Sequence, residues 1–513
     1  MSFAKRLIPL AMAASLAAGP AAAAGPPPAD ADLAALVRLL GAKGVLTPGE
    51  EEAFLDRLTG QAADRPTVTI LPEGDRTLGI ISDNVARDLK AEVKEELKAE
   101  IKSEVASEVR QEGWAASTPG WSKRIRWGGD VRLRYQGSFF DEGNDRAFTD
   151  PESATAFINT TDDRHRARVR VRLGATARVH ETVEAGVKIA TGNEREPIST
   201  NETLGDAFNK DSLVLDQAYL KWSPIPEVTL WGGRLPNPFV SSELVWDRDL
   251  NPEGLALQGE LPVAGTWRLF ANAGLFPLEE VERAQRDKWL AAGQMGARWQ
   301  PSPVLLAELA TSLYDYRHTA GEMNPLASPG LYDWTAPRFR QGGNTVFNIN
   351  AFTGGTPRFA LASEFREVNV SGSLDIGVFA PVHVILTADW VRNLGYDAQD
   401  VLDLAGYAPD KADTGYLLGL SVGHASLVNL GDWRVGLQYR YLEANAVLDA
   451  FTDSDFHPLG TNARGWLLSG ELGLTSSLSV AGRFITSDLI EGRNAASDEL
   501  SVDTVQVDLN AKF

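Results

Sequence analysis

The sequence predicts an all-β transmembrane barrel of about 16 antiparallel strands, preceded by an N-terminal α-helical (coiled-coil) extension in the periplasm. Three observations predict this fold. A two-residue alternation of polar and apolar side chains runs from residue 124 to the C-terminus. Long and short connections alternate between the predicted strands, and the chain opens with an export signal.

Residues 1–24 are typical of a secretory signal peptide. Lys5 and Arg6 precede a short apolar run, and small residues then lead to an A-x-A site near Ala24. The alternative is a short membrane anchor, which is disfavoured because the apolar run is too short to cross a bilayer. We therefore expect an exported chain with no transmembrane helix after the signal.

Helical segments are expected between the signal and the barrel. Residues 25–81 are predicted to form a periplasmic helical hairpin and a linker. Residues 82–112 are rich in Ala, Glu and Lys, with aliphatic side chains at every fourth position. A lone helix cannot bury such a stripe, so a coiled coil is predicted, with a solvated single helix as the alternative. Residues 113–123 form a linker that contains Gly, Pro and Ser.

The barrel itself is predicted from residue 124 to residue 513. An even number of strands, with long loops on one side and short turns on the other, is typical of outer-membrane barrels. The short turns include SPIPE, PVAG, QPSP, FAP and TSS. A barrel this wide cannot be filled by its own side chains, so we expect it to enclose water. The predicted strands are 124–138, 163–177, 182–191, 213–222, 227–234, 253–261, 266–275, 289–299, 303–315, 358–378, 381–392, 413–424, 431–443, 464–475, 478–487 and 501–513.

The stretch DDRHRARVRVRLGATARV, at 162–179, places an arginine at every second position with mostly aliphatic residues between them. A strand turns successive side chains to opposite faces. Five arginines on a lipid-facing wall would cost roughly 10–20 kcal/mol, at about 2–4 kcal/mol each, and a packed core would cost more. This ladder alone fits both a water-filled barrel and a soluble sandwich with one solvated face.

Other strands favour the membrane barrel. In RIRWGGDVRLRYQ, Arg132 and Arg134 share one face with Gln136, and the last strand, VDTVQVDLNAKF, alternates in the same way until Phe513. Eight tryptophans fall on the predicted apolar face, mostly near strand ends, as in the aromatic girdles of membrane barrels. They are Trp222, Trp231, Trp267, Trp289, Trp299, Trp390, Trp433 and Trp466.

Several of these segments resemble the putative-porin family of Gram-negative outer-membrane β-barrels. The resemblance implies a place in the cell outer membrane of a Gram-negative bacterium, passive diffusion of small hydrophilic solutes, and a homotrimer. It also implies contact with outer-membrane lipid and lipopolysaccharide, and leaves open contact between residues 30–112 and peptidoglycan. The matching pieces are RIRWGGDVRLRYQG (124–137), LDQAYLKW (215–222), WGGRLPNPF (231–239), LVWDRDLNPEGLALQ (244–258) and Phe513, and GVLTPGEEEAF is similar to the periplasmic start of such porins.

The predicted inner face is basic although the whole chain carries a net charge of -20. The negative surplus is therefore expected in the loops and the N-terminal region. Because lumen charge sets selectivity, we predict a weak anion preference or little selectivity. The predicted pore-lining residues are Arg132, Arg134, Arg164, Arg166, Arg168, Arg170, Arg172, Arg234, Arg434 and Arg440.

The third long connection, residues 235–252, is the predicted constriction loop. It carries Glu243, Asp247 and Asp249, and the family resemblance suggests that it folds inward. An acidic loop that faces the arginine ladder would set a transverse field across the narrowest section. The alternative is an ordinary solvated loop.

Composition and motifs argue against other classes of function. The acidic charge disfavours nucleic-acid binding, and the absence of cysteine excludes disulfides and thiolate metal sites. The segment DRDLN begins like a calcium loop, but Pro252 and Gln258 stand where that loop needs Gly and Glu. We expect no cofactor, no metal site and no enzyme. The remaining alternative is a structural tether or adhesin, whose barrel anchors the periplasmic helix or displays surface loops.

Overall fold

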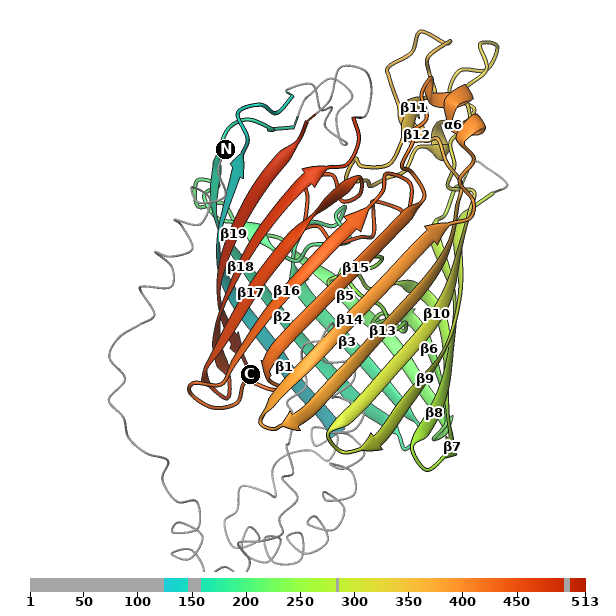
Figure 1. Ribbon diagram of the computed structural model, residues 1–513. Helices are drawn as coiled ribbons and strands as arrows, with labels where there is room; N and C mark the ends of the chain where they lie inside the picture. Colours follow the sequence, from blue (N-terminus) through green and yellow to red (C-terminus); the bar gives the residue numbers. More distant parts are fainter. Residues whose placement is uncertain (1–123, 146–157, 283–285, 493–498) are drawn as a thin grey trace, which may run out of the picture. The chain divides into compact units, whose positions relative to one another are not determined.

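The computed structural model describes residues 124–145, 158–282, 286–492 and 499–513. The expected signal peptide, helical hairpin, coiled-coil helix and linker therefore lie outside the described residues. The described chain forms an antiparallel β-barrel (Figure 1), which confirms the predicted fold class for this part. Its sixteen long strands are β1 (Ile125–Phe140), β2 (Arg164–His180), β3 (Val183–Thr191), β5 (Leu213–Ile225), β6 (Val228–Arg234), β7 (Glu253–Ala264), β8 (Trp267–Glu279), β9 (Lys288–Ser302), β10 (Leu305–Arg317), β13 (Phe365–Phe379), β14 (Val382–Asn393), β15 (Thr414–His424), β16 (Trp433–Leu442), β17 (Ala463–Thr475), β18 (Leu478–Leu489) and β19 (Ser501–Lys512).

The barrel closes between its first and last strands. β1 pairs antiparallel with β2 on one side and with β19 on the other, so that Arg134 lies opposite both Arg168 and Asp508. The two-residue strand β4 (Glu202–Thr203) adds to β2 beyond the end of β3. Because first and last strands pair, the long strands leave no edge whose backbone groups would be unsatisfied in lipid.

The strand alternation separates an apolar outer face from a polar inner face. In β1, the side chain of Leu133 is 49% exposed, whereas Arg132 and Arg134 are 8% and 2% exposed. Tyr135 and Trp127 share the outer face with Leu133 and are likewise exposed. A continuous exposed apolar wall is stable in a bilayer, where the aliphatic and aromatic side chains meet acyl chains instead of water.

The long loops lie at the rim of the barrel where β1 ends, and the short turns lie at the opposite rim. We number the long loops in chain order and use loop 2 (192–212), loop 3 (235–252), loop 5 (318–364), loop 6 (394–413) and loop 7 (443–462) below. Among the described residues, no helix has both the length and the hydropathy to cross a bilayer.

Loops 5 and 6 build a small cap at the rim (Figure 1). It contains β11 (Val346–Asn348), β12 (Phe359–Leu361), the 3-10 helix η2 (Asp333–Thr335) and α6 (Ala398–Ala405). The two strands and α6 share an apolar core around Phe347, Ile349 and Val401. Asp397 caps α6 by accepting hydrogen bonds from two backbone N–H groups. Gly406 ends the helix in a left-handed conformation, with φ of 79°.

Two predictions at the level of single strands are wrong. The predicted strand 358–378 starts too early, because residues 359–361 form β12 and pair with β11 in the cap. The polar–apolar alternation of the sequence continues from β12 into the next strand, so it did not reveal that the two strands are separate. Trp231 was placed on the outer face, but its Nε1 donates to Gln258 (2.8 Å) and its ring packs against the interior core. The inner and outer faces of β6 are therefore the reverse of those predicted.

The outer face of β1 tests the lipid assignment. We expect Leu133→Arg to lower the free energy of unfolding by about 2–4 kcal/mol, because Leu133 lies mid-strand and a charge there meets the bilayer midplane. The matched control, Leu213→Arg at the loop end of β5, should cost about 0–1 kcal/mol. Urea unfolding in lipid vesicles measures both. Equal costs for the two variants would contradict the assignment.

Candidate functional site

Loop 3 folds into the barrel and becomes part of its core. Its side chains Leu235, Phe239, Leu244 and Trp246 are buried against inner-wall residues such as Tyr314. The loop fits there because it is unusually apolar, and because the inner faces of β8 to β10 carry a matching apolar section: Phe276, Leu290, Tyr314 and Tyr316. Loop 3 is therefore a packed element and not an ordinary solvated loop.

Polar contacts fix loop 3 to the far wall. The amide of Gln294, on β9, accepts from the N–H of Val240 (2.9 Å) and donates to its carbonyl oxygen (2.8 Å). The carboxylate of Asp389, on β14, accepts from the N–H of Ser242 (3.1 Å). These contacts satisfy backbone groups that the loop would otherwise bury without partners.

Loop 7 packs on loop 3 inside the barrel. The N–H of Asp247 donates to the carbonyl oxygen of Phe451 (2.7 Å), and the hydroxyl of Thr452 donates to that of Leu244 (2.9 Å). The rings of Trp246 and Phe451 stack with their centroids 6.1 Å apart. We refer to loops 3 and 7 together as the inner loop pair.

The inner loop pair encloses a buried arginine. Arg440, on β16, has a fully buried side chain whose Nη2 lies 3.0 Å from Asp453 and 3.8 Å from Glu243. Its guanidinium also stands over the ring of Phe456, 4.4 Å from the centroid. Arg440 faces inward as predicted, but it holds the two loops together instead of facing water, because sequence alternation does not show which inner residues a loop covers.

Burial changes the ionisation of carboxyls in the inner loop pair. Burial, reinforced by Glu243, raises the pKa of Asp453 to about 6, against the opposing effect of Arg440. Burial and the neighbouring carboxylates of Asp249 and Asp453 raise the pKa of Asp247 well above its usual value. Burial acts in the same direction on Asp249, but Arg170 and Arg172 outweigh it and lower its pKa to about 2.

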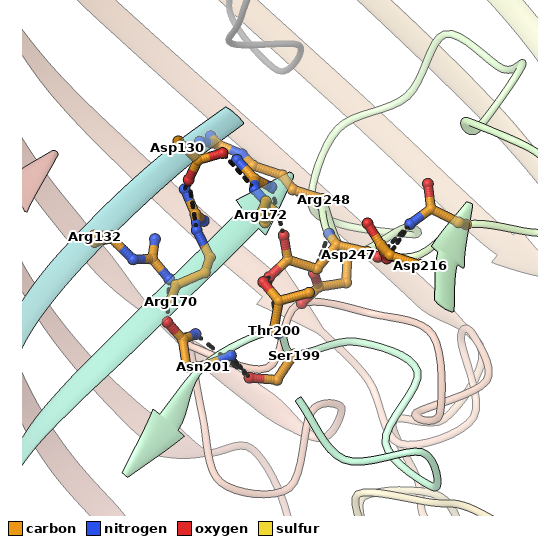
Figure 2. A network of polar contacts seen from close by, with 12 residues as sticks. Asp130, Arg132, Arg170, Arg172, Ser199, Thr200, Asn201, Asp216, Asp247 and Arg248 are labelled. Carbon is orange, nitrogen blue, oxygen red and sulfur yellow. Dashed lines mark hydrogen bonds and ion pairs between the residues drawn. The ribbon is translucent and has the colours of Figure 1, made fainter. Parts of the chain in front are cut away.

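The lower part of the arginine ladder faces carboxylates from the wall and from loop 3 (Figure 2). Asp130, on β1, lies between Arg170 and Arg172, with both N–O distances at 2.7 Å. Asp249, on loop 3, lies 3.3 Å from Arg172 and accepts from the hydroxyl of Thr200 (2.8 Å). Loop 3 thus reaches from β14 to β2 and ties loop 2 to the same network.

Arg134 joins the closing strands to loop 7. Its Nε lies 2.7 Å from Asp508 on β19, and its Nη1 lies 2.8 Å from Asp455. Burial disfavours the charged form of Asp455, but Arg134 and Arg483 hold its pKa well below the usual value. Neighbouring Arg132 contacts Asp508 at 3.9 Å and hydrogen-bonds to the side chain of Asn201.

The remaining predicted arginines differ in placement. Arg164, Arg166 and Arg168 lie on the inner face of β2 and form no ion pair within the part of the chain that the structure describes. Arg434 faces inward near the short turns and donates to the carbonyl oxygen of Ala425 (2.8 Å). The prediction that Arg234 lines the pore is wrong, because the inner and outer faces of β6 are the reverse of those predicted. Its guanidinium donates to the backbone carbonyl oxygen of Asp216 and pairs with Glu253.

Three acidic partners were missed by the sequence analysis. Asp216 lies 2.6 Å from Lys188, where a register shift in the pairing of β3 with β5 breaks the alternation. Asp453 and Asp455 lie on loop 7, where no periodicity assigns a face. The acidic run DSD was the only available signal. No group of three or more His, Asp or Glu residues in the described ranges is placed to hold a metal ion.

Comparison with known proteins places this geometry in context. A protein-family model described as "Putative porin" matches residues 32–513. No curated protein matches. Solved structures with a similar fold include Pseudomonas putida OprB at high pH, with 13% identity over 76% of this chain and 95% of that one and a TM-score of 0.43. The outer membrane channel DcaP of Acinetobacter baumannii has 13% identity over 76% of this chain and 97% of that one, with a TM-score of 0.41.

The raised pKa of Asp453 makes the stability of loop 7 depend on pH. The pKa of this carboxyl is about 6 in the folded protein and near 3.9 in the unfolded chain, so the ionised carboxylate destabilises the folded loop. This destabilisation is absent at low pH and grows as the pH rises from 3.9 through 6. Asp453→Asn removes this destabilisation. At pH 7 we expect the amide hydrogens of loop 7 to exchange more slowly in the variant than in the wild type. The ratio of the two exchange rates should be about tenfold smaller at pH 5.

Hydrogen exchange of residues 449–456 at both pH values measures this difference. Comparing the two proteins cancels the opposite contribution of His457, whose pKa burial lowers to about 4. Asp249 stays ionised throughout this window, because its pKa is about 2. If the ratio of the exchange rates of wild type and variant increased on acidification, the raised pKa of Asp453 would be contradicted.

Proposed function

The chain belongs to the putative porin family, and we propose that it is a non-enzymatic outer-membrane channel for the passive diffusion of small hydrophilic solutes. The observation that carries this proposal is the charged inner wall of a closed barrel whose outer wall is apolar. Strands β18, β19, β1 and β2 line the interior with Arg483, Arg132, Arg134 and the ladder. A barrel of this strand number encloses an interior that its own wall side chains cannot fill.

We propose that loop 3 narrows the channel. Its apolar side packs on the wall, while Asp249 points toward the basic strands and Asp247 accepts from the backbone N–H groups of Asp249 and Ser454. Opposite charges on the two sides of a narrow section orient polar solutes and disfavour apolar ones. The wall between β18 and β2 carries more arginines than acidic residues, which supports a weak anion preference.

The remaining features of the proposal concern export and assembly. Residues 1–24 would direct export and be removed, and residues 82–112 would form a coiled coil in the periplasm. A homotrimer in contact with lipid and lipopolysaccharide fits both the family and the exposed apolar wall. Contact between residues 30–112 and peptidoglycan is the corresponding proposal for the periplasmic part.

A planar bilayer tests the proposed function. We expect the purified full-length protein to give ohmic single-channel currents, with a reversal potential in a salt gradient that indicates a weak anion preference. A closed, non-conducting barrel would contradict the channel and favour the structural tether or adhesin. Strong cation selectivity would show instead that the acidic loops, and not the basic wall, dominate the field.

A further inference from the structure

The arginine ladder of β2 consists of a neutralised part and an open part. Arg170 and Arg172 share the carboxylate of Asp130, and Arg172 also pairs with Asp249. The other three arginines form no ion pair with any acidic residue of the described ranges. We call these three the open ladder: Arg164, Arg166 and Arg168.

The neighbours of the open ladder are neutral. Arg168 donates to the side-chain oxygen of Gln136 and to the backbone carbonyl of Asn201, both at the long distance of 3.3 Å. Across the sheet, Arg166 lies opposite Gln136, which lies opposite Gln506. Gln506 is 1% exposed, and neither its amide oxygen nor its amide nitrogen has a hydrogen-bond partner in the described structure.

The guanidinium groups themselves retain unused donors. The Nε atoms of Arg166 and Arg168 are buried, and the described structure gives them no acceptor. Each guanidinium has five N–H donors, and buried polar groups in native proteins are nearly always satisfied. An oxyanion in the channel would supply this row of donors with acceptors that the described residues do not provide.

Carboxylates near the open ladder do not neutralise it. Those that influence Arg166 most are Asp455, on loop 7, and Glu196, on loop 2. Asp455 is already held by Arg134 at 2.8 Å and by Arg483 at 3.7 Å. Among the described ion pairs, none includes Arg164, Arg166 or Arg168, so these carboxylates act on the open ladder only from a longer distance.

The open ladder is also accessible. Arg164 begins β2 directly after the first long loop, so the row starts at the rim that carries the long loops. Its side chain is exposed, and those of Arg166 and Arg168 are half-buried. The neutralised arginines lie further along the strand, next to Asp249 of loop 3. A solute that enters from the long-loop side would therefore meet the unpaired charges first.

We propose that the open ladder binds oxyanions that carry two or more negative charges, such as phosphate or a short dicarboxylate. This inference rests on the proposed channel function and names the solute class that the entrance recognises. Alternate residues on one face of a strand are about 7 Å apart, and each guanidinium presents a fork of donors that matches an oxyanion. A doubly charged solute can engage two forks, whereas chloride or acetate engages one.

Block of single-channel current tests the proposal. Inorganic phosphate, succinate, acetate and chloride are added in turn on the long-loop side of the full-length wild-type channel. We expect phosphate or succinate to reduce the current at a concentration about tenfold below that of acetate, since a second charged hydrogen bond adds at least one order of magnitude. The relative potency of phosphate and succinate shows which oxyanion the row prefers.

Charge-removing variants locate the binding site. Arg166→Gln and Arg168→Gln should each raise the half-blocking concentration of the doubly charged anion about tenfold. Neither variant removes the ion-pair partner of a carboxylate in the part of the barrel that the structure describes. The matched control is Arg126→Gln, which removes the same charge from the inner face near the short turns, where Arg126 pairs with Glu184. It should leave the half-blocking concentration within about twofold, because the exposed pair is distant and screened.

Folding and binding are checked separately. Arg166→Lys keeps the charge but loses the fork, and should give an intermediate loss of affinity in a barrel that still shows heat-modifiable mobility. Titration calorimetry with phosphate measures binding without any need for current. A conducting channel blocked equally by acetate and phosphate, or a block unchanged by Arg166→Gln, would overturn the open ladder as a site. A wild-type barrel without conductance would overturn the proposed channel function instead.

Discussion

The placement of the arginine ladder constrains the rest of this structure. A strand that alternates guanidinium groups with aliphatic side chains needs water or carboxylates on one face and an apolar medium on the other. Closure of the sheet meets both needs, because it gives every strand an inside and an outside. The pairing of β1 with β19 completes that closure and puts Arg134 beside Asp508. The same pairing leaves Leu133 and Tyr135 exposed on the outer wall.

The interior is divided between an apolar side and a charged side. From β8 to β16 the inner wall carries an apolar section, interspersed with polar residues such as Gln294 and Asp389, and loops 3 and 7 pack there around Trp246 and Tyr314. From β18 to β2 the wall carries arginines, and the same loops turn Asp249 and Asp455 toward them. The loops therefore act both as a hydrophobic core and as counter-charges. This arrangement explains how a chain with a net charge of -20 can present a basic inner wall.

Strand number, strand parity and loop alternation could be predicted from sequence because they depend on a local two-residue period. The period identified all sixteen long strands and the inward direction of Arg132 and Arg170. It failed where local geometry breaks: the inner position of Trp231, and Asp216 at a register shift. It gave no information on loop packing, so the burial of Arg440 between Asp453 and Glu243 was not foreseen.

The most direct test of the account asks which face of β2 meets water. The natural chain has no cysteine, so single cysteines can be placed at Arg166, Ala167, Arg168 and Val169 without interference. Each variant is exposed to a charged, membrane-impermeant thiol reagent in lipid vesicles. Modification of the cysteines at 166 and 168, with protection of those at 167 and 169, is the expected result. The opposite pattern, or equal modification of all four, would contradict the assignment of the arginine ladder to an aqueous interior.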